Sequence, residues 1–178
     1  PTPIGHSVPY KKQDTLGEEV QKQVLLAIQA LGMDNCPVNC DLMEKDGKIY
    51  VIEITGRAGG NCLPEMVGIY YGIDYYEAIV RLAMDMQAEE LFQDQKNRFQ
   101  NAAQRKCGER PENTDGNLNR VTPNLSHILT SDRDGILKAI HNDNEASPDL
   151  LDLSFNVEPG EEIRHYENGR DRLGQVII

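Results

Sequence analysis

The sequence contains no tryptophan and no uninterrupted apolar run of the roughly 18–20 residues that a membrane-spanning helix needs. It also lacks the pattern of a secretory signal peptide at its N-terminus. We therefore expect no association with membranes. Because the chain begins with Pro1 rather than Met, we expect either a processed protein or a piece of a longer one.

Paired cysteine motifs are absent as well. The four cysteines, Cys36, Cys40, Cys62 and Cys107, form no C-x-x-C pair and have no His-x-His partner nearby, which argues against a zinc site. Their scatter in an enzyme-like sequence favours reduced thiols and a cytoplasmic location. The net charge of −11 argues against nucleic acid as a partner, although an acidic chain can still carry a local positive pocket.

What is present is the pattern of a soluble α+β protein. Apolar residues recur at helical spacing from Val20 to Leu31, Gly32 follows, and Asp14 or Thr15 is placed to cap the start of this helix. Asp46-Gly47 is a turn signal between two apolar strands. The expected helices are 16–31, 64–71 and 75–92, and the expected strands are 38–44, 48–55, 126–130, 150–157 and 175–178.

The composition changes after residue 92. Polar and charged residues dominate 93–122, which we interpret as a polar helix followed by a linker. We therefore predict three parts: an α+β unit over 1–92, this connection, and a small β-rich domain over 123–178.

Two carboxylates interrupt the hairpin. Asp41 and Glu53 stand in otherwise apolar strands, and the second strand is apolar enough to predict cover on both faces. A carboxylate in a buried strand is costly unless it is paired or binds a metal. Mg²⁺ prefers such hard oxygen ligands, so two nearby carboxylates are a candidate magnesium site.

The geometry of this pair depends on the loop. A two-residue turn at Asp46-Gly47 would place Asp41 and Glu53 on opposite faces. A three-residue loop that includes Lys45 would pair Asp41 with Val51 and put both carboxylates on one face. We expect the three-residue loop and a shared face. In a simpler alternative, Glu53 forms a salt bridge with Arg57 and Asp41 lies at a solvated strand end.

The segment from Asp41 to Arg57 resembles the signature of ATP-grasp ligases. That family has an acidic residue, a short hairpin with glycine at its turn, and then Glu-aliphatic-Asn-x-Arg. The following Arg57-Ala-Gly-Gly60 and Gly72-Ile-Asp74 are similar to the carboxylate–amine ligase and carbamoyl-phosphate-synthase-like branch. The resemblance covers about residues 3–90 and implies the second half of an ATP-grasp fold, an antiparallel sheet with helices.

The resemblance also implies roles for single residues. Asp41 and Glu53 would hold Mg²⁺, or Mn²⁺, that bridges ATP phosphates, and Arg57 would bind a phosphate or an acyl phosphate. Thr55 stands where the family usually has an asparagine metal ligand, which puts the second metal position in doubt. His6 resembles a position near the substrate, although a lone histidine in a loop is more often incidental.

For the complete enzyme, the resemblance implies ATP-dependent activation of a small carboxylate and attack on the acyl phosphate by an amine or a similar nucleophile. The flap and lysines of the family's other half are missing here, so that half would be supplied in cis or in trans. Two alternatives remain: a non-catalytic or split subunit that acts through a partner chain, and a structural α+β domain with chance spacing. A homo-oligomer is compatible with each of these.

Overall fold

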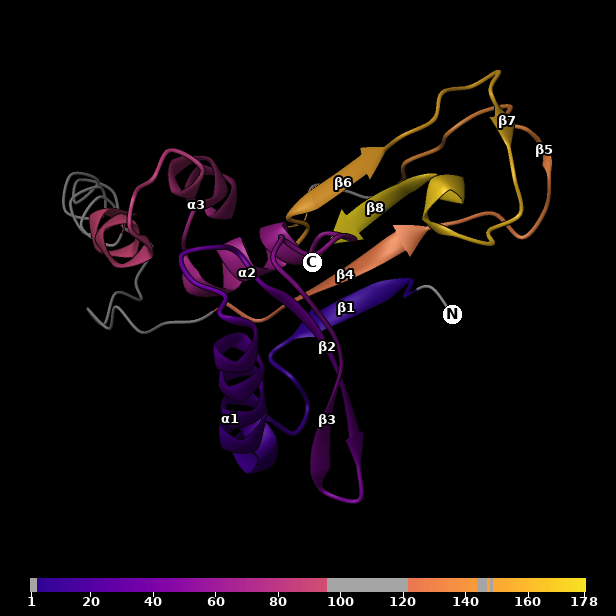
Figure 1. Cartoon of the computed structure of the whole chain (residues 1–178). Coiled ribbons are helices and arrows are strands. Elements are labelled where there is room, and N and C mark those ends of the chain that lie inside the picture. Colours follow the sequence, from indigo (N-terminus) through magenta and orange to yellow (C-terminus); the bar gives the residue numbers. More distant parts are fainter. Residues whose placement is uncertain (1–2, 96–121, 144–146, 148) are drawn as a thin grey trace.

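The computed structural model describes residues 3–95, 122–143, 147 and 149–178, and it shows the predicted α+β fold of helices and antiparallel sheets (Figure 1). Most of the predicted connection over 93–122 lies outside these residues. The elements are β1 (Gly5–Val8), α1 (Gln13–Leu31), β2 (Asn39–Lys45), β3 (Lys48–Thr55), α2 (Leu63–Tyr71), α3 (Tyr75–Leu82), β4 (Asn124–Leu129), β5 (Gly135–Ile136), β6 (Asp152–Phe155), β7 (Glu162–Ile163), the short 3₁₀ helix η1 (Gly169–Asp171) and β8 (Gly174–Ile177).

The main sheet has four antiparallel strands in the order β1-β4-β8-β6. Helix α2 packs against one face of it, and the buried core there joins Cys62 and Met66 to Ile128 and Ile177. Strand β1 pairs with β4 over Gly5–Val8, so the first strand of the chain completes a sheet that its last third builds. This arrangement brings the start of the chain next to α2.

Helix α1 covers one face of the β2–β3 hairpin, where Ile49 is buried (Figure 1). The helix ends at Gly32, whose φ of 63° is the left-handed conformation expected of a terminating glycine. Its start differs from the prediction, because Lys12 occupies the N-cap and Asp14 lies in the first turn. The Thr15 hydroxyl donates to the Lys12 carbonyl oxygen at 3.2 Å, so it does not accept a capping hydrogen bond.

The opposite face of the hairpin is open, contrary to the prediction that both faces of the second strand are covered. Tyr50, Ile52 and Glu53 on β3 and Met43 on β2 are all exposed within the described part of the chain. The continuous apolar pattern therefore does not reflect burial among the described residues, and it leaves an exposed apolar surface there.

The helix expected over 75–92 is split into α3 and a second helical stretch over 88–95. Asp74 caps α3, because its side chain accepts from the Glu77 amide at 2.8 Å. The break follows from a distant contact. Asn35 donates to the Met86 carbonyl at 3.0 Å and accepts from the Ala88 amide at 2.9 Å, so it supplies partners where the helix is interrupted.

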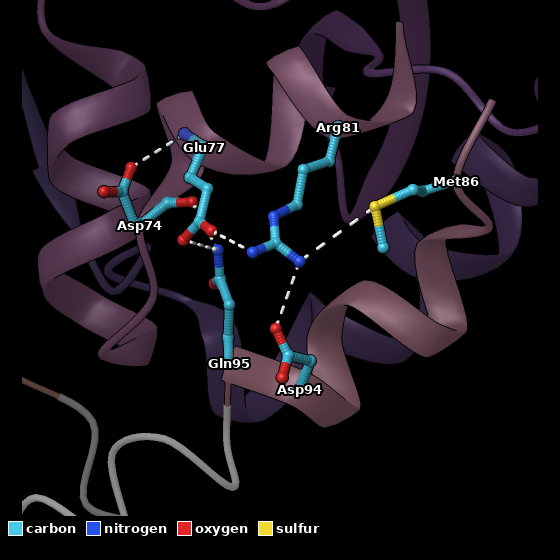
Figure 2. A network of polar contacts seen from close by, with 6 residues as sticks. All are labelled: Asp74, Glu77, Arg81, Met86, Asp94 and Gln95. Atoms are coloured by element: carbon cyan, nitrogen blue, oxygen red, sulfur yellow. Dashed lines mark hydrogen bonds and ion pairs between the residues drawn. The ribbon is translucent and has the colours of Figure 1, made fainter. Parts of the chain in front are cut away.

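Arg81 links the two helical stretches through ion pairs (Figure 2). Its guanidinium lies 2.6 Å from a Glu77 carboxylate oxygen and 3.1 Å from an Asp94 carboxylate oxygen. Beside it, the Gln95 amide donates to the Asp74 carbonyl at 2.8 Å. This network lies on α3 and the helical stretch over 88–95, whereas the hairpin carboxylates belong to β2 and β3.

The C-terminal strands fall within a few residues of their predicted bounds, and two further strands appear. β5 and β7 have two residues each and form their own two-stranded sheet. Strands this short are too brief to show the alternation of apolar and polar residues from which a strand is predicted. Within the described residues, no helix has both the length and the apolar character needed to cross a bilayer.

Candidate functional site

Asp41 and Glu53 lie directly opposite each other on β2 and β3. The loop itself has two residues, because Lys45 pairs with Lys48 and both Asp46 and Gly47 have positive φ, so the predicted three-residue loop is wrong. A β-bulge restores the shared face. The register passes from Leu42–Val51 to Asp41–Glu53, which leaves Ile52 as the extra residue of β3.

Asp41 and Glu53 begin a row of oxygen-bearing side chains on one face of the hairpin, and Asn39 extends this row. It pairs with Thr55 and, by the two-residue period of a strand, faces the same way as Asp41. Its amide nitrogen lies 3.4 Å from an Asp41 carboxylate oxygen, and the Thr55 hydroxyl lies 3.5 Å from the Asn39 carbonyl oxygen. Sequence reasoning missed Asn39, although its position two residues before Asp41 was a usable signal.

The two carboxylates are exposed, so burial does not force them to bind a cation. Glu53 and Arg57 form no ion pair with each other, which rules out the simple salt-bridge alternative. Arg57 instead donates one hydrogen bond to the Ala58 carbonyl at 2.8 Å and is otherwise exposed. Its remaining donors are available to a ligand.

His6 on β1 lies close enough to Asp41 for the two to interact electrostatically. Burial lowers the pKa of His6 below its usual value of 6.5, and the Asp41 charge acts in the opposite direction. Its Nε2 atom is buried and has no hydrogen-bond partner among the described residues, and the same holds for Oγ of Ser126, its cross-strand neighbour. The structure thus brings the candidate histidine near Asp41, one of the two candidate carboxylates.

The glycine-rich loop after β3 is held under steric constraint. A Cβ on Gly59 would lie 2.5 Å from Oδ1 of Asn39 and 2.6 Å from Cδ1 of Leu63. Asn61 and Cys62 both adopt the left-handed region, with φ of 53° and 68°. Consecutive non-glycine residues in that region are uncommon and occur more often at binding sites.

The oxygen atoms in this row are suitable ligands for a hard cation. Two opposed carboxylates, one amide and one hydroxyl supply oxygen atoms, and Mg²⁺ needs only one or two carboxylates when phosphates complete its shell. In the described part of the chain, no group of three or more His, Cys, Asp or Glu side chains could hold a metal by itself. The row therefore fits a metal shared with a phosphorylated ligand better than a closed structural site.

Comparisons with known proteins agree on one kind of relative. A family model for L-amino acid ligase C-terminal domain 2 matches residues 127–178. The structure of phosphoribosylglycinamide synthetase from Anaerococcus prevotii matches 99% of this chain at 34% identity, with a TM-score of 0.79. An L-amino acid ligase structure from Bacillus licheniformis matches 97% of the chain at 18% identity, with a TM-score of 0.71. No curated protein sequence matches.

The chain spans only 40% and 38% of the length of these two structures. Both relatives are ATP-grasp enzymes, and the whole of the described fold is similar to a part of each. Together with the hairpin signature, these matches show that the chain is similar to the C-terminal portion of ATP-grasp ligases.

Proposed function

We propose that this chain supplies the metal-binding side of the nucleotide site in an ATP-dependent ligase that joins a small carboxylate to an amine or a similar nucleophile. The direct opposition of Asp41 and Glu53 on the open face of the hairpin carries this proposal. The similarity to phosphoribosylglycinamide synthetase and to L-amino acid ligase supports the class of reaction.

Asp41 and Glu53 would hold Mg²⁺ from one side and leave its other positions to ATP phosphate oxygens. A bound Mg²⁺ would neutralise the phosphates and so make them better targets for a carboxylate. Thr55 and Asn39 contribute a hydroxyl and an amide on the same face, and we assign Thr55 as the third, weaker ligand. Asp41 and Glu53 are exposed, whereas Asn39 and Thr55 are half-buried, so a ligand can reach the two carboxylates without rearrangement of the strands.

Arg57 would stabilise negative charge on the transferred phosphoryl group or on the acyl phosphate. Its guanidinium can form two parallel hydrogen bonds to such an anion. His6 would contact the substrate, because burial keeps it neutral and its Nε2 has no partner among the described residues. A neutral imidazole can donate or accept a hydrogen bond without repelling the metal.

The remaining part of the nucleotide site would come from the N-terminal half of the family's fold, in cis or in trans. The exposed apolar side chains of the hairpin, which include Met43, Tyr50 and Ile52, favour cover by another part of the enzyme. The same surface also suits a split subunit that works through a partner chain.

The test is calorimetric titration of Mg·ATP into residues 1–178, alone and with the N-terminal half present. We expect weak binding by the chain alone, because carboxylates repel the triphosphate when no cations face them. Adding the other half should strengthen binding, and Glu53→Ala should remove that gain.

The matched control is Asp46→Asn. It removes one charge from the same hairpin but keeps a residue that tolerates the positive φ of 53° at this position. Unchanged binding after Glu53→Ala would contradict the proposed metal role. Micromolar binding by the isolated chain would contradict the need for a second half.

A further inference from the structure

The glycine-rich loop after β3 is tied to the main sheet at Cys62. This residue lies between the loop and α2, where it is the N-cap of the helix and has a left-handed φ of 68°. Its thiol donates a hydrogen bond to the side-chain oxygen of Gln175 on β8, and the two atoms are 3.0 Å apart. The contact joins residues that are 113 positions apart in the sequence.

Gln175 is itself held in one orientation. Its amide nitrogen donates to an Asp152 carboxylate oxygen on β6 at 3.0 Å, and the Ser154 hydroxyl donates to the same oxygen at 3.3 Å. Because an ionised carboxylate only accepts hydrogen bonds, the nitrogen of the Gln175 amide must face Asp152. The amide oxygen is therefore the atom that faces Cys62.

The environment of Cys62 keeps its thiol in the form that this contact needs. The residue is buried, with 4% of its surface exposed. Burial raises the pKa of the Cys62 thiol, and the nearby Glu65 charge raises it further. The thiol therefore stays protonated at neutral pH and can donate to Gln175.

The same loop packs against the oxygen row of the hairpin. A Cβ on Gly59 would lie 2.5 Å from Oδ1 of Asn39, so the loop backbone touches this side chain of the row. The loop is thus anchored to the hairpin at Gly59 and to the C-terminal sheet at Cys62. A left-handed backbone is unfavourable for a residue with a Cβ and persists only where its surroundings hold it. The bond to Gln175 is a contact that can hold Cys62 in this conformation.

We propose that Gln175 is a positioning residue of the nucleotide site. Through Cys62 it fixes the loop that carries Arg57 and that packs against Asn39. This inference rests on the function proposed above. It gives the segment over 127–178, which the family model matches, a part in arranging the residues of the hairpin site.

The first test is calorimetric titration of Mg·ATP into the chain with the N-terminal half present. Gln175→Met and Cys62→Ala each remove the bond, and we expect each to weaken binding by about three- to tenfold. Cys62→Ser keeps a donor at the same position and should bind like the wild type. Ser154→Ala is the matched control, because it removes a hydrogen bond to Asp152 but leaves the Cys62–Gln175 bond in place.

The second test needs no nucleotide. The ¹H–¹⁵N NMR signals of the Asn39 side-chain amide and of the Gly59 backbone amide are recorded for the folded chain alone. Gln175→Met and Cys62→Ala should shift both signals, whereas Cys62→Ser and Ser154→Ala should leave them near their wild-type positions. Gln175 is only half-buried, so its substitution keeps the comparison available even if Cys62→Ala does not fold.

The outcomes separate this inference from the proposed function. Unchanged Mg·ATP affinity in Gln175→Met, together with a loss of binding in Glu53→Ala, would refute the positioning role and leave the metal site standing. A lower unfolding temperature with unchanged affinity would likewise reduce Gln175 to a purely structural contact. If Glu53→Ala does not weaken binding, the proposed function fails, and unshifted Asn39 and Gly59 signals in Gln175→Met would refute the link between the sheet and the loop as well.

Discussion

Asp41 and Glu53 are direct cross-strand neighbours, and both are exposed on the face of the hairpin that α1 does not cover. Two like charges in this position repel each other and destabilise the strand pair. The pair is thus unfavourable for the hairpin alone and favourable only when a cation lies between the two carboxylates. Stability and metal binding should therefore respond in opposite directions when one charge is removed.

We predict that Asp41→Asn raises the free energy of unfolding by about 0.2–1 kcal/mol in buffer without divalent cations. The same variant should lose any stabilisation that Mg²⁺ gives the wild type. Urea unfolding with and without Mg²⁺ measures both effects, and Asp46→Asn serves as the charge-matched control. An equal response of the two variants to Mg²⁺ would show that no cation binds at the pair.

Thr55 offers a test of the second metal position. Thr55→Asn places an amide oxygen in the row, and we expect Mg·ATP to bind about two- to tenfold more tightly in the assembled enzyme, a gain of up to about 1.4 kcal/mol. Thr55→Val keeps the shape and removes the hydroxyl, so it should weaken binding or leave it unchanged. Titration calorimetry compares the three proteins, and tighter binding by Thr55→Val would refute the assignment of Thr55 as a ligand.

Gly59 is required by a close approach rather than by its backbone angles. A Cβ there would meet Oδ1 of Asn39 at 2.5 Å and Leu63 at 2.6 Å. Gly59→Ala should therefore lower the free energy of unfolding by about 1–3 kcal/mol and displace Asn39 from the row. Gly60→Ala is the control, because nothing lies within 4 Å of its Cβ position. Equal effects of both substitutions on the urea midpoint would contradict this explanation.

The sequence predicted the helices and strands near the site more accurately than it predicted their register and their burial. The hairpin and the helix that ends at Gly32 follow from local patterns, because turn and termination preferences act over a few residues. The shared face of Asp41 and Glu53 was predicted from a loop of the wrong length, and the bulge at Ile52 produces it instead. Local spacing does not indicate a bulge within an apolar strand.

Other features depend on contacts between residues far apart in the sequence, so they could not be predicted from local sequence patterns. The break after α3 relies on Asn35, which lies more than fifty residues earlier in the sequence. The exposure of β3 depends on what covers the hairpin, and nothing in the described part of the chain covers its open face. The domain boundaries and the roles of His6, Thr55 and Arg57 stay predictions.

Arg81 should stabilise the packing of α3 against the helical stretch over 88–95. Its contacts with Glu77 and Asp94 are partly shielded, since 29% of the Arg81 side chain is exposed. Arg81→Met should lower the free energy of unfolding by about 1 kcal/mol, and by less at high salt. Arg133→Met, whose salt bridge to Asp132 is at the surface, should change it less than Arg81→Met does. Urea unfolding at two salt concentrations compares these values.

His6 links the stability of the fold to pH. Burial lowers the pKa of its imidazolium, so the folded chain binds fewer protons at this residue than the unfolded chain does. The stabilising contribution of neutral His6 is therefore fully present above the usual histidine pKa of 6.5. It is lost progressively as the pH falls below 6.5 toward the pKa of His6 in the folded chain. The urea concentration at the unfolding midpoint should therefore decrease when the pH is lowered from 7.5 to 5.5 in the wild type.

Substitutions at His6 and at Asp41 should change the pH dependence in opposite directions. His6→Gln removes the titrating group and should flatten the change in urea midpoint over this range. Asp41→Asn removes the charge that favours the imidazolium, so the pKa of His6 should fall further and the decrease in stability should become steeper. An unchanged slope in His6→Gln would show that other groups control the pH dependence. An unchanged or shallower slope in Asp41→Asn would show that the Asp41 charge does not raise the pKa of His6, and the two residues would then not belong to one site.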